Sequence, residues 1–323
     1  EEQVASADKV RREMRDGIVV VTIDNPPLAT LTADVRTNLL REIDEAAADD
    51  GVRAIVIAGT GDVFAAGASV SEAPEDAAPD LARLCDRIEA TDKPVVAAIQ
   101  GSALGGGLEL ALAAHLRVAH PKARLGGPEI TVGLVPSGGG TQRLPKVIGG
   151  TAALKMLLSG RAISGENAAK LGLVDVLAVG DAIDEAVSAA GRLADSGGEL
   201  RRSSTRRDRL GEGTAFLEAV ATHRKVAAQS PLEAPGRMIE CIEAALLLPY
   251  DIGRGLEQAA YEDLVQSDHS RSLRHIFAAE RQLQAAPRMW SGCGLRRGCG
   301  ATGWSSSALP QAPVRNLTQR RVP

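Results

Sequence analysis

The segment from Lys93 to Pro136 constrains the fold of this chain more than any other stretch. It opens with an apolar run at 94–99, passes through a glycine-rich turn into helix-forming residues from about Gly106, and becomes strand-like again at 116–119. Short apolar runs bounded by glycine are typical of buried strands. A strand, a helix and a second strand in succession require a crossover connection, which predicts an α/β fold built in layers.

Two carboxylates, Glu109 and Glu129, stand in apolar or glycine-rich surroundings within this segment. An unpaired carboxylate near an apolar core is costly or takes a raised pKa, so a chain keeps one there mainly where it has partners or a use. Glu109 follows Gly106 by three residues and shares a face of the predicted helix with its unpaired N–H groups. This predicts a cavity lined by an oxyanion donor and a carboxylate, although close helix–sheet packing with a solvent-facing Glu109 explains the same glycine cluster.

Four segments carry a resemblance to a known family. They read NPPLATLT at 25–32, FAAGASV at 64–70, AAIQGSALGGGLELALA at 97–113 and LGGPEITVGLVPSGGGTQRLP at 125–145. In this order and at this spacing they resemble the crotonase superfamily, the enoyl-CoA hydratase/isomerase family. The resemblance covers roughly residues 16–285. It implies the ClpP/crotonase-like fold, an α/β superhelix of β-β-α units with a helical C-terminal region.

The C-terminal helical segments narrow the resemblance further. PYDIGRGLEQAAYEDLVQS at 249–267 and LRHIFAAER at 273–281 look like the end of the N-terminal hydratase half of multifunctional β-oxidation enzymes. In those enzymes a 3-hydroxyacyl-CoA dehydrogenase follows.

The resemblance also implies the residues of an active site. It assigns Glu109 and Glu129 as catalytic carboxylates, and the backbone N–H groups of Ala68 and Gly106 as an oxyanion hole. The substrate-binding positions that it implies are Leu28, Ala29, Ala66, Gly67, Gly105, Pro128 and Pro136. The chain departs from many relatives at Ala29, where they carry asparagine, and this puts its acyl-chain preference in doubt more than its reaction type.

The implied reaction is the syn addition of water to a trans-2-enoyl-CoA, giving a 3-hydroxyacyl-CoA in fatty acid β-oxidation. Relatives that only shift a double bond need a single carboxylate, matching Glu129, so the presence of Glu109 favours hydration. A Δ3,Δ2-enoyl-CoA isomerase and a non-catalytic crotonase-like binding protein are the alternatives. No metal or redox cofactor is implied, because coenzyme A arrives as part of the acyl-CoA thioester substrate. Free-standing relatives are usually trimers or dimers of trimers, so a homotrimer or hexamer is expected.

Composition argues against several other classes of function. The 323 residues carry a net charge of -4, which gives no electrostatic reason to expect a nucleic acid or an anionic membrane surface as a partner. Aromatic residues make up 2% of the chain, too few to suggest a stacking platform for bases. The sequence has no membrane-spanning apolar run and no secretory signal, so a cytoplasmic location is expected. The cysteines and histidines lack zinc-ligand spacing, so no metal site is expected.

The pattern along the chain predicts three parts. Residues 1–190 are expected to form the crotonase core, and 191–285 a helical C-terminal region with apolar residues at helical spacing. The Gly/Ser/Arg-rich tail at 286–323 is expected to be disordered. Its glycines are spaced GxGxxxG with no apolar strand before them, which argues against a dinucleotide site. The segment SGGGTQRLPKVIG at 137–149 is expected to be another glycine turn.

Overall fold

The computed structural model describes residues 9–67, 80–209, 211 and 213–285. The chain divides into two units, Glu1–Arg281 and Gln282–Pro323. Two of the predictions, the oxyanion donor Ala68 and the disordered tail at 286–323, concern positions outside the described residues.

The larger sheet has six strands in the order β1-β2-β3-β5-β7-β10. These strands are Val10–Arg15, Ile18–Ile23, Ala54–Gly59, Val95–Ile99, Leu116–Ala119 and Val176–Leu177. Strand β1 pairs antiparallel with β2, whereas the remaining pairs are parallel. Strands β2, β3 and β5 are almost wholly buried, which is why they read as continuous apolar runs in the sequence.

A smaller sheet has the order β4-β6-β8-β9, from Val63–Ala65, Ser102–Leu104, Arg124–Gly126 and Ile163–Ser164. Each of β3, β5 and β7 in the larger sheet is followed along the chain by a strand of the smaller sheet, namely β4, β6 and β8. A helix comes next in the first two cases, so β-β-α units repeat. This confirms the α/β crotonase architecture expected from the resemblance.

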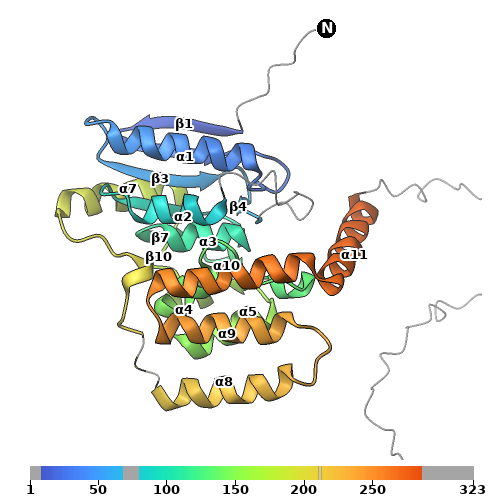
Figure 1. Ribbon diagram of the computed structural model, residues 1–323. Helices are drawn as coiled ribbons and strands as arrows, with labels where there is room; N and C mark the ends of the chain where they lie inside the picture. Colours follow the sequence, from blue (N-terminus) through green and yellow to red (C-terminus); the bar gives the residue numbers. More distant parts are fainter. Residues whose placement is uncertain (1–8, 68–79, 210, 212, 286–323) are drawn as a thin grey trace, which may run out of the picture. The chain divides into compact units, whose positions relative to one another are not determined.

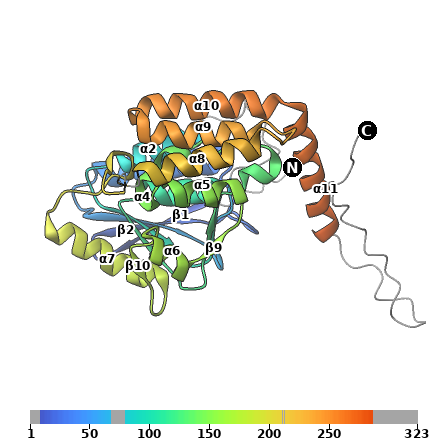
Figure 2. The ribbon, with the colours of Figure 1, turned by 90° about the horizontal axis from the view of Figure 1, so that it is seen from below.

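Two apolar layers cover the faces of the larger sheet. On one face, alternate residues of β2, β3 and β5 such as Val20, Val56 and Val96 pack against α7, Ala182–Ser196. On the other face, Val19, Ile57 and Ala97 belong to the main core together with residues from most of the other helices. Figure 2 shows α7 on the side of the sheet away from α8, α9 and α10. The alternation of side chains along each strand therefore places the helices in layers on both faces.

The remaining helices build the core side of the molecule. They are α1 Ala33–Ala48, α2 Leu81–Glu89, α3 Gly106–Ala113, α4 Gly140–Ile148, α5 Gly150–Ser159, α6 Gly165–Leu171, α8 Gly213–Ala227, α9 Ala234–Leu247, α10 Tyr250–Gln266 and α11 Asp268–Ala285, with short 3-10 turns η2 Glu129–Val132 and η3 Ser203–Thr205. Helices α8 and α9 contact α5, and α9 and α10 contact α4 (Figure 1). The C-terminal helices are thus packed directly on elements of the core.

Two local expectations differ from the structure. The segment predicted as a glycine turn at 137–149 contains helix α4, with Pro145 inside it. Its first N–H groups are capped by carboxylates from distant helices, which the local sequence does not reveal. The first strand, β1, was not expected because its sequence is charged; it is an edge strand with most residues exposed. Asp16-Gly17, both at positive φ, form its hairpin turn and were the available signal.

The close approach of α3 to β4 depends on Gly107. A Cβ at this position would lie 2.0 Å from the carbonyl oxygen of Ala65. We predict that Gly107→Ala lowers the free energy of unfolding by about 1 to 3 kcal/mol, because backbone must move to admit the methyl group. The matched substitution is Gly255→Ala, at a helix position where an added Cβ would meet no described atom outside its own helix backbone within 4 Å. It should raise the free energy of unfolding by roughly 0.5 to 1 kcal/mol. Urea unfolding of both variants measures these changes. A free energy of unfolding that Gly107→Ala leaves unchanged would contradict the packing described.

Candidate active site

The end of β4 and the start of α3 meet at a pair of glycines. A Cβ on Gly67, which has φ +85°, would lie 3.6 Å from the backbone nitrogen of Gly106. The carbonyl of Gly67 accepts a hydrogen bond from the N–H of Leu31, and the N–H of Ala66 donates to the carbonyl of Leu28. The segment around Leu28 and Ala29 is therefore tied to the residues just before position 68, beside the N-terminus of α3.

Glu109 lies in the first turn of α3 and is 3% exposed. Its Oε1 accepts hydrogen bonds from the N–H groups of Gly138, at 2.7 Å, and Gly140, at 2.8 Å. A Cβ on Gly140 would lie within 2.9 Å of both this oxygen and the Cβ of Pro136. Glu109 is therefore not a solvent-facing residue but a buried acceptor that anchors the loop before α4.

Glu129 begins the 3-10 turn η2, with Pro128 as its N-cap. A Cβ on Gly105 would approach its Oε1 to 2.9 Å, and one on Gly127 would approach its Oε2 to 3.0 Å. Oε2 is buried and has no hydrogen-bond partner among the described residues. A buried acceptor without a partner is costly unless it is protonated or binds a ligand. Glu129 therefore offers a reactive carboxyl group directly beside the turn that starts α3.

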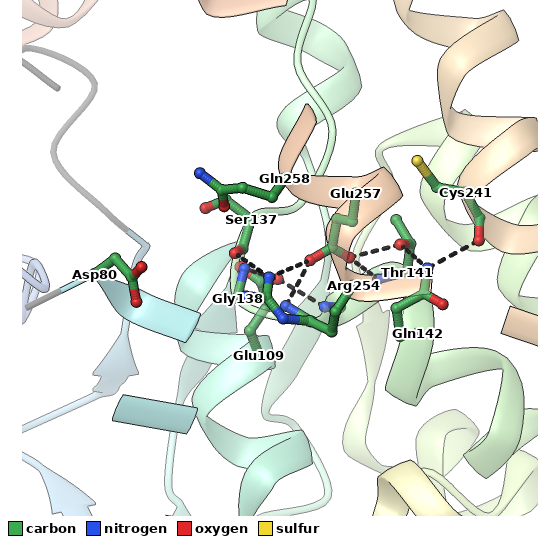
Figure 3. A network of polar contacts seen from close by, with 12 residues as sticks. Asp80, Glu109, Ser137, Gly138, Thr141, Gln142, Cys241, Arg254, Glu257 and Gln258 are labelled. Atoms are coloured by element: carbon green, nitrogen blue, oxygen red, sulfur yellow. Dashed lines mark hydrogen bonds and ion pairs between the residues drawn. The ribbon is translucent and has the colours of Figure 1, made fainter. Parts of the chain in front are cut away.

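A third buried carboxylate, Glu257 from α10, reaches the same region and was missed in the sequence. It is fully buried. Its oxygens accept hydrogen bonds from the N–H of Gly139 at 2.7 Å, the N–H of Thr141 at 2.8 Å and the Thr141 hydroxyl at 2.5 Å. Figure 3 shows Glu109 and Glu257 meeting the same stretch of backbone from two different helices.

The sequence did contain a signal for Glu257. The buried face of α10 carries Gly253, Glu257, Ala260 and Leu264, so a carboxylate occupies a position where helical spacing calls for an apolar residue. The neighbouring apolar residue, Leu256, is 46% exposed.

Arginine side chains fix the carbonyl groups of the same loop. Arg143 donates from Nη1 to the carbonyl of Gly138 at 2.8 Å and pairs with Asp86 at 2.6 Å and Glu89 at 3.1 Å. Arg254 donates to the carbonyl of Ser137 at 3.2 Å. Consecutive N–H and C=O groups of the loop are thus satisfied by side chains from α3, α4 and α10, while α2 supplies the carboxylates that hold Arg143, and together these contacts hold the backbone rigidly.

Burial disfavours charge at all three glutamates. Burial, reinforced by the negative charges of Glu257 and Glu129, raises the pKa of Glu109 to about 8. Burial also raises the pKa of Glu129 to about 7, with Glu257 acting in the same direction. The pKa of Glu257 is raised by burial against the opposing effect of its Thr141 and Arg254 contacts. These raised pKa values favour a protonated carboxyl group within the cluster near neutral pH, which suits acid and base work.

The structure brings most of the predicted site residues together. Gly67, Gly105 and Gly106 line one turn, Glu129 contacts it, and Glu109 projects from it toward Pro136. Leu28 and Ala66 are joined by a backbone hydrogen bond, and Ala29 lies beside Leu28 with φ 49°. The carbonyl of Pro128, the N-cap of η2, accepts a hydrogen bond from the N–H of Thr131. Ala68 lies outside the described residues, so its predicted oxyanion role stays a prediction.

Three further observations concern the described residues. A cleft of about 430 Å³ is lined by residues including His120, Lys122 and Arg124, and by none of the predicted site residues. Within the described ranges no group of three or more His, Cys, Asp or Glu side chains could hold a metal ion. Among the described helices, none combines the length and apolar character needed to cross a membrane.

The chain is similar to a known family and to several longer proteins. Residues 13–206 match the family described as Enoyl-CoA hydratase/isomerase. The peroxisomal bifunctional enzyme of Homo sapiens is 35% identical over 306 residues, which is 93% of this chain and 41% of the relative. The peroxisomal fatty acid beta-oxidation multifunctional protein AIM1 of Arabidopsis thaliana is 35% identical over 286 residues, covering 85% of this chain and 40% of that one. The chain thus spans about two fifths of the length of these curated relatives.

A solved structure agrees with the sequence matches. A carnitinyl-CoA dehydratase from Mycobacterium avium 104 is 26% identical to this chain, with a TM-score of 0.62. The match covers 84% of this chain and 97% of that structure. The described fold is therefore shared over nearly the whole of that protein.

The raised pKa of Glu109 predicts a pH-dependent stability. Glu109 has a folded-state pKa of about 8 against an ordinary 4.5. Its protonation therefore contributes to the free energy of unfolding fully below about pH 4.5, and this contribution is lost as pH rises through 8. Glu109→Gln keeps the shape but removes this titration. Its free energy of unfolding, relative to the unsubstituted protein, should rise by about 2 to 4 kcal/mol between pH 4.5 and 9. Urea unfolding at both pH values measures the difference, and a difference independent of pH would contradict the raised pKa.

Proposed function

Because the chain belongs to the enoyl-CoA hydratase/isomerase family, we propose that it is an enoyl-CoA hydratase, a carbon–oxygen lyase that adds water to a trans-2-enoyl-CoA to give a 3-hydroxyacyl-CoA. The observation that carries this proposal is the convergence of the buried Glu109 and the partly buried Glu129 on the glycine turn that begins α3. Hydration needs a base for water and an acid for carbon, and one carboxyl group for each lies at this turn, Glu109 from α3 and Glu129 from η2.

The electrophilic part of the site is the backbone of this turn. The N–H of Gly106 is the first of helix α3 and carries the positive end of the helix dipole. In our proposal it donates to the thioester oxygen together with the N–H of Ala68. Negative charge builds on this oxygen as water adds at the β-carbon, and losing one such donor typically costs about 3 to 4 kcal/mol of barrier.

The two glutamates divide the proton transfers. Glu109 is oriented by the N–H groups of Gly138 and Gly140, and in our proposal it takes a proton from water as the hydroxyl group bonds to the β-carbon. Glu129 delivers a proton to the α-carbon from its unpaired carboxyl oxygen. The proton on Glu109 then returns to Glu129 before the next turnover. Both groups adjoin one glycine turn, which supports addition to one face of the double bond, the syn outcome.

A second candidate, Δ3,Δ2-enoyl-CoA isomerase, is favoured by one observation. The buried Oε2 of Glu129 has no partner among the described residues, and a single free carboxyl group is enough to carry a proton between the α- and γ-carbons. The hydratase proposal gives Glu109 an essential role that the isomerase does not, so substitution at Glu109 distinguishes them. A non-catalytic binding protein would need neither carboxylate.

The names of the relatives bear on pathway and location. The Arabidopsis protein is described as a peroxisomal fatty acid beta-oxidation protein, which supports β-oxidation as the pathway proposed here. The peroxisomal location stated in these names belongs to the relatives, and the cytoplasmic location expected from the sequence stays a prediction. A homotrimer or hexamer likewise stays a prediction, and an acyl-CoA thioester is the substrate that we propose, without a metal or redox cofactor.

The function is tested by the ultraviolet absorbance of the conjugated thioester in crotonyl-CoA. We predict rapid loss of absorbance with the unsubstituted protein. Glu109→Gln and Glu129→Gln should each lower kcat by roughly 10² to 10⁴, because each removes one partner in proton transfer. The exposed Glu262→Gln, on α10, is a matched control that should leave the rate unchanged.

Other outcomes separate the candidates. The isomerase would be established instead if a 3-enoyl-CoA gained conjugated absorbance while crotonyl-CoA lost none. That gain should depend on Glu129 but not on Glu109. No change with either substrate would contradict both enzymatic proposals.

A further inference from the structure

The loop before α4 alternates its N–H groups between two carboxylates. Gly138 and Gly140 donate to Glu109, whereas Gly139 and Thr141 donate to Glu257. Neighbouring N–H groups along this backbone thus point to different helices, α3 and α10. The start of α4 is capped from both sides at once, and a shift of either carboxylate would move the loop that orients the other.

The surroundings of Glu257 favour its charged form more than those of Glu129. Three donors reach its oxygens from Gly139 and Thr141, and Arg254 lies 3.5 Å away. The other ionisable groups that act on it or feel it are Glu109, Glu129 and the thiol of Cys241 on α9. Glu129 Oε2 has no partner among the described residues. A negative charge at Glu257 is therefore the best stabilised of the three, and it disfavours two further charges nearby.

Helix α11 also contacts the turn η2, which carries Glu129. Ser270 of α11 is fully buried and donates from Oγ to the carbonyl of Val132, at 2.9 Å, within the turn that begins at Glu129. A Cβ on Gly133 would lie 3.2 Å from the side chain of Leu273. Helices α10 and α11 therefore contact both loops that position the glutamates.

We infer that Glu257 is a positioning residue for the proposed hydration: its carboxylate fixes the 137–141 loop against Glu109, and its charge keeps one proton on the Glu109–Glu129 pair. This inference rests on the proposed function for its role in turnover, but its electrostatic part concerns the protein alone. Hydration by an acid and a base requires one proton on the pair. A third charge that opposes ionisation of both partners maintains that state at neutral pH.

The test is a carboxyl titration by NMR in protein labelled with [δ-13C]glutamate. The resonances of Glu109 and Glu129 are assigned by their loss in Glu109→Gln and Glu129→Gln. In Glu257→Gln the apparent pKa of Glu109 should fall by about one pH unit, because a nearby negative charge is removed. The exposed Glu262→Gln is the control and should leave the titration unchanged. Circular dichroism confirms that the variants are folded.

Kinetics on crotonyl-CoA supply the second readout. Glu257→Gln should lower kcat by about tenfold at pH 7.5, move the pH–rate profile to lower pH and leave KM within about threefold. A purely structural role would lower stability without moving the titration or the profile, and a folded Glu257→Gln with both unchanged would overturn the inference. If the unsubstituted protein is inactive, the proposed function fails while the titration still decides the electrostatic claim.

A milder variant covers the case in which Glu257→Gln does not fold. Thr141→Val removes the hydroxyl donor to Glu257 but keeps the backbone donor. Weaker support for the charge on Glu257 should move the Glu109 titration in the same direction by a smaller amount. An unchanged titration in folded Thr141→Val would then overturn the inference.

Discussion

The structure depends on a short piece of backbone, 138–141, held between buried carboxylates. Without Glu109 and Glu257, the N–H groups at the start of α4 would lack partners, and without those N–H groups the two buried carboxyl groups would lack donors. The two sets of groups satisfy each other, and each such hydrogen bond contributes about 1.5 to 3 kcal/mol where the carboxyl group is ionised. The site is therefore assembled only when α3, α4 and α10 are packed together, which makes the C-terminal helices part of it.

This dependence explains how a site with raised pKa values can persist in a folded protein. Burial penalises charge at Glu109 and Glu129. At Glu109 the chain offsets part of the cost through the N–H groups of Gly138 and Gly140, which also orient the carboxyl group. Close backbone approach matters as much. Glycines at 105 and 127 leave room for the Glu129 carboxyl group, since a Cβ at either position would come within about 3.0 Å of it. Small residues thus place an acid beside the helix start that binds the thioester oxygen in our proposal.

Much of the fold could be predicted from the sequence, and the site only in part. The strand at 116–119 and the helix that begins at Gly106 were located correctly because their apolar runs and glycine boundaries are local signals. Helix α4 was missed because its caps come from residues far away in sequence. The edge strand β1 was missed because its exposed face is charged. Glu257 was missed for a related reason: its partners are backbone groups of a loop more than 100 residues earlier, and only the structure joins them.

The central claim is that two carboxyl groups beside one glycine turn add water across a double bond from one face. Hydration of crotonyl-CoA in D2O, followed by NMR of the 3-hydroxybutyryl-CoA formed, tests it most directly. The claim predicts one deuterium at the α-carbon, on the same face as the new hydroxyl group. Deuterium on the opposite face, or on both faces equally, would contradict a shared site for Glu109 and Glu129, and the absence of product would contradict hydration itself.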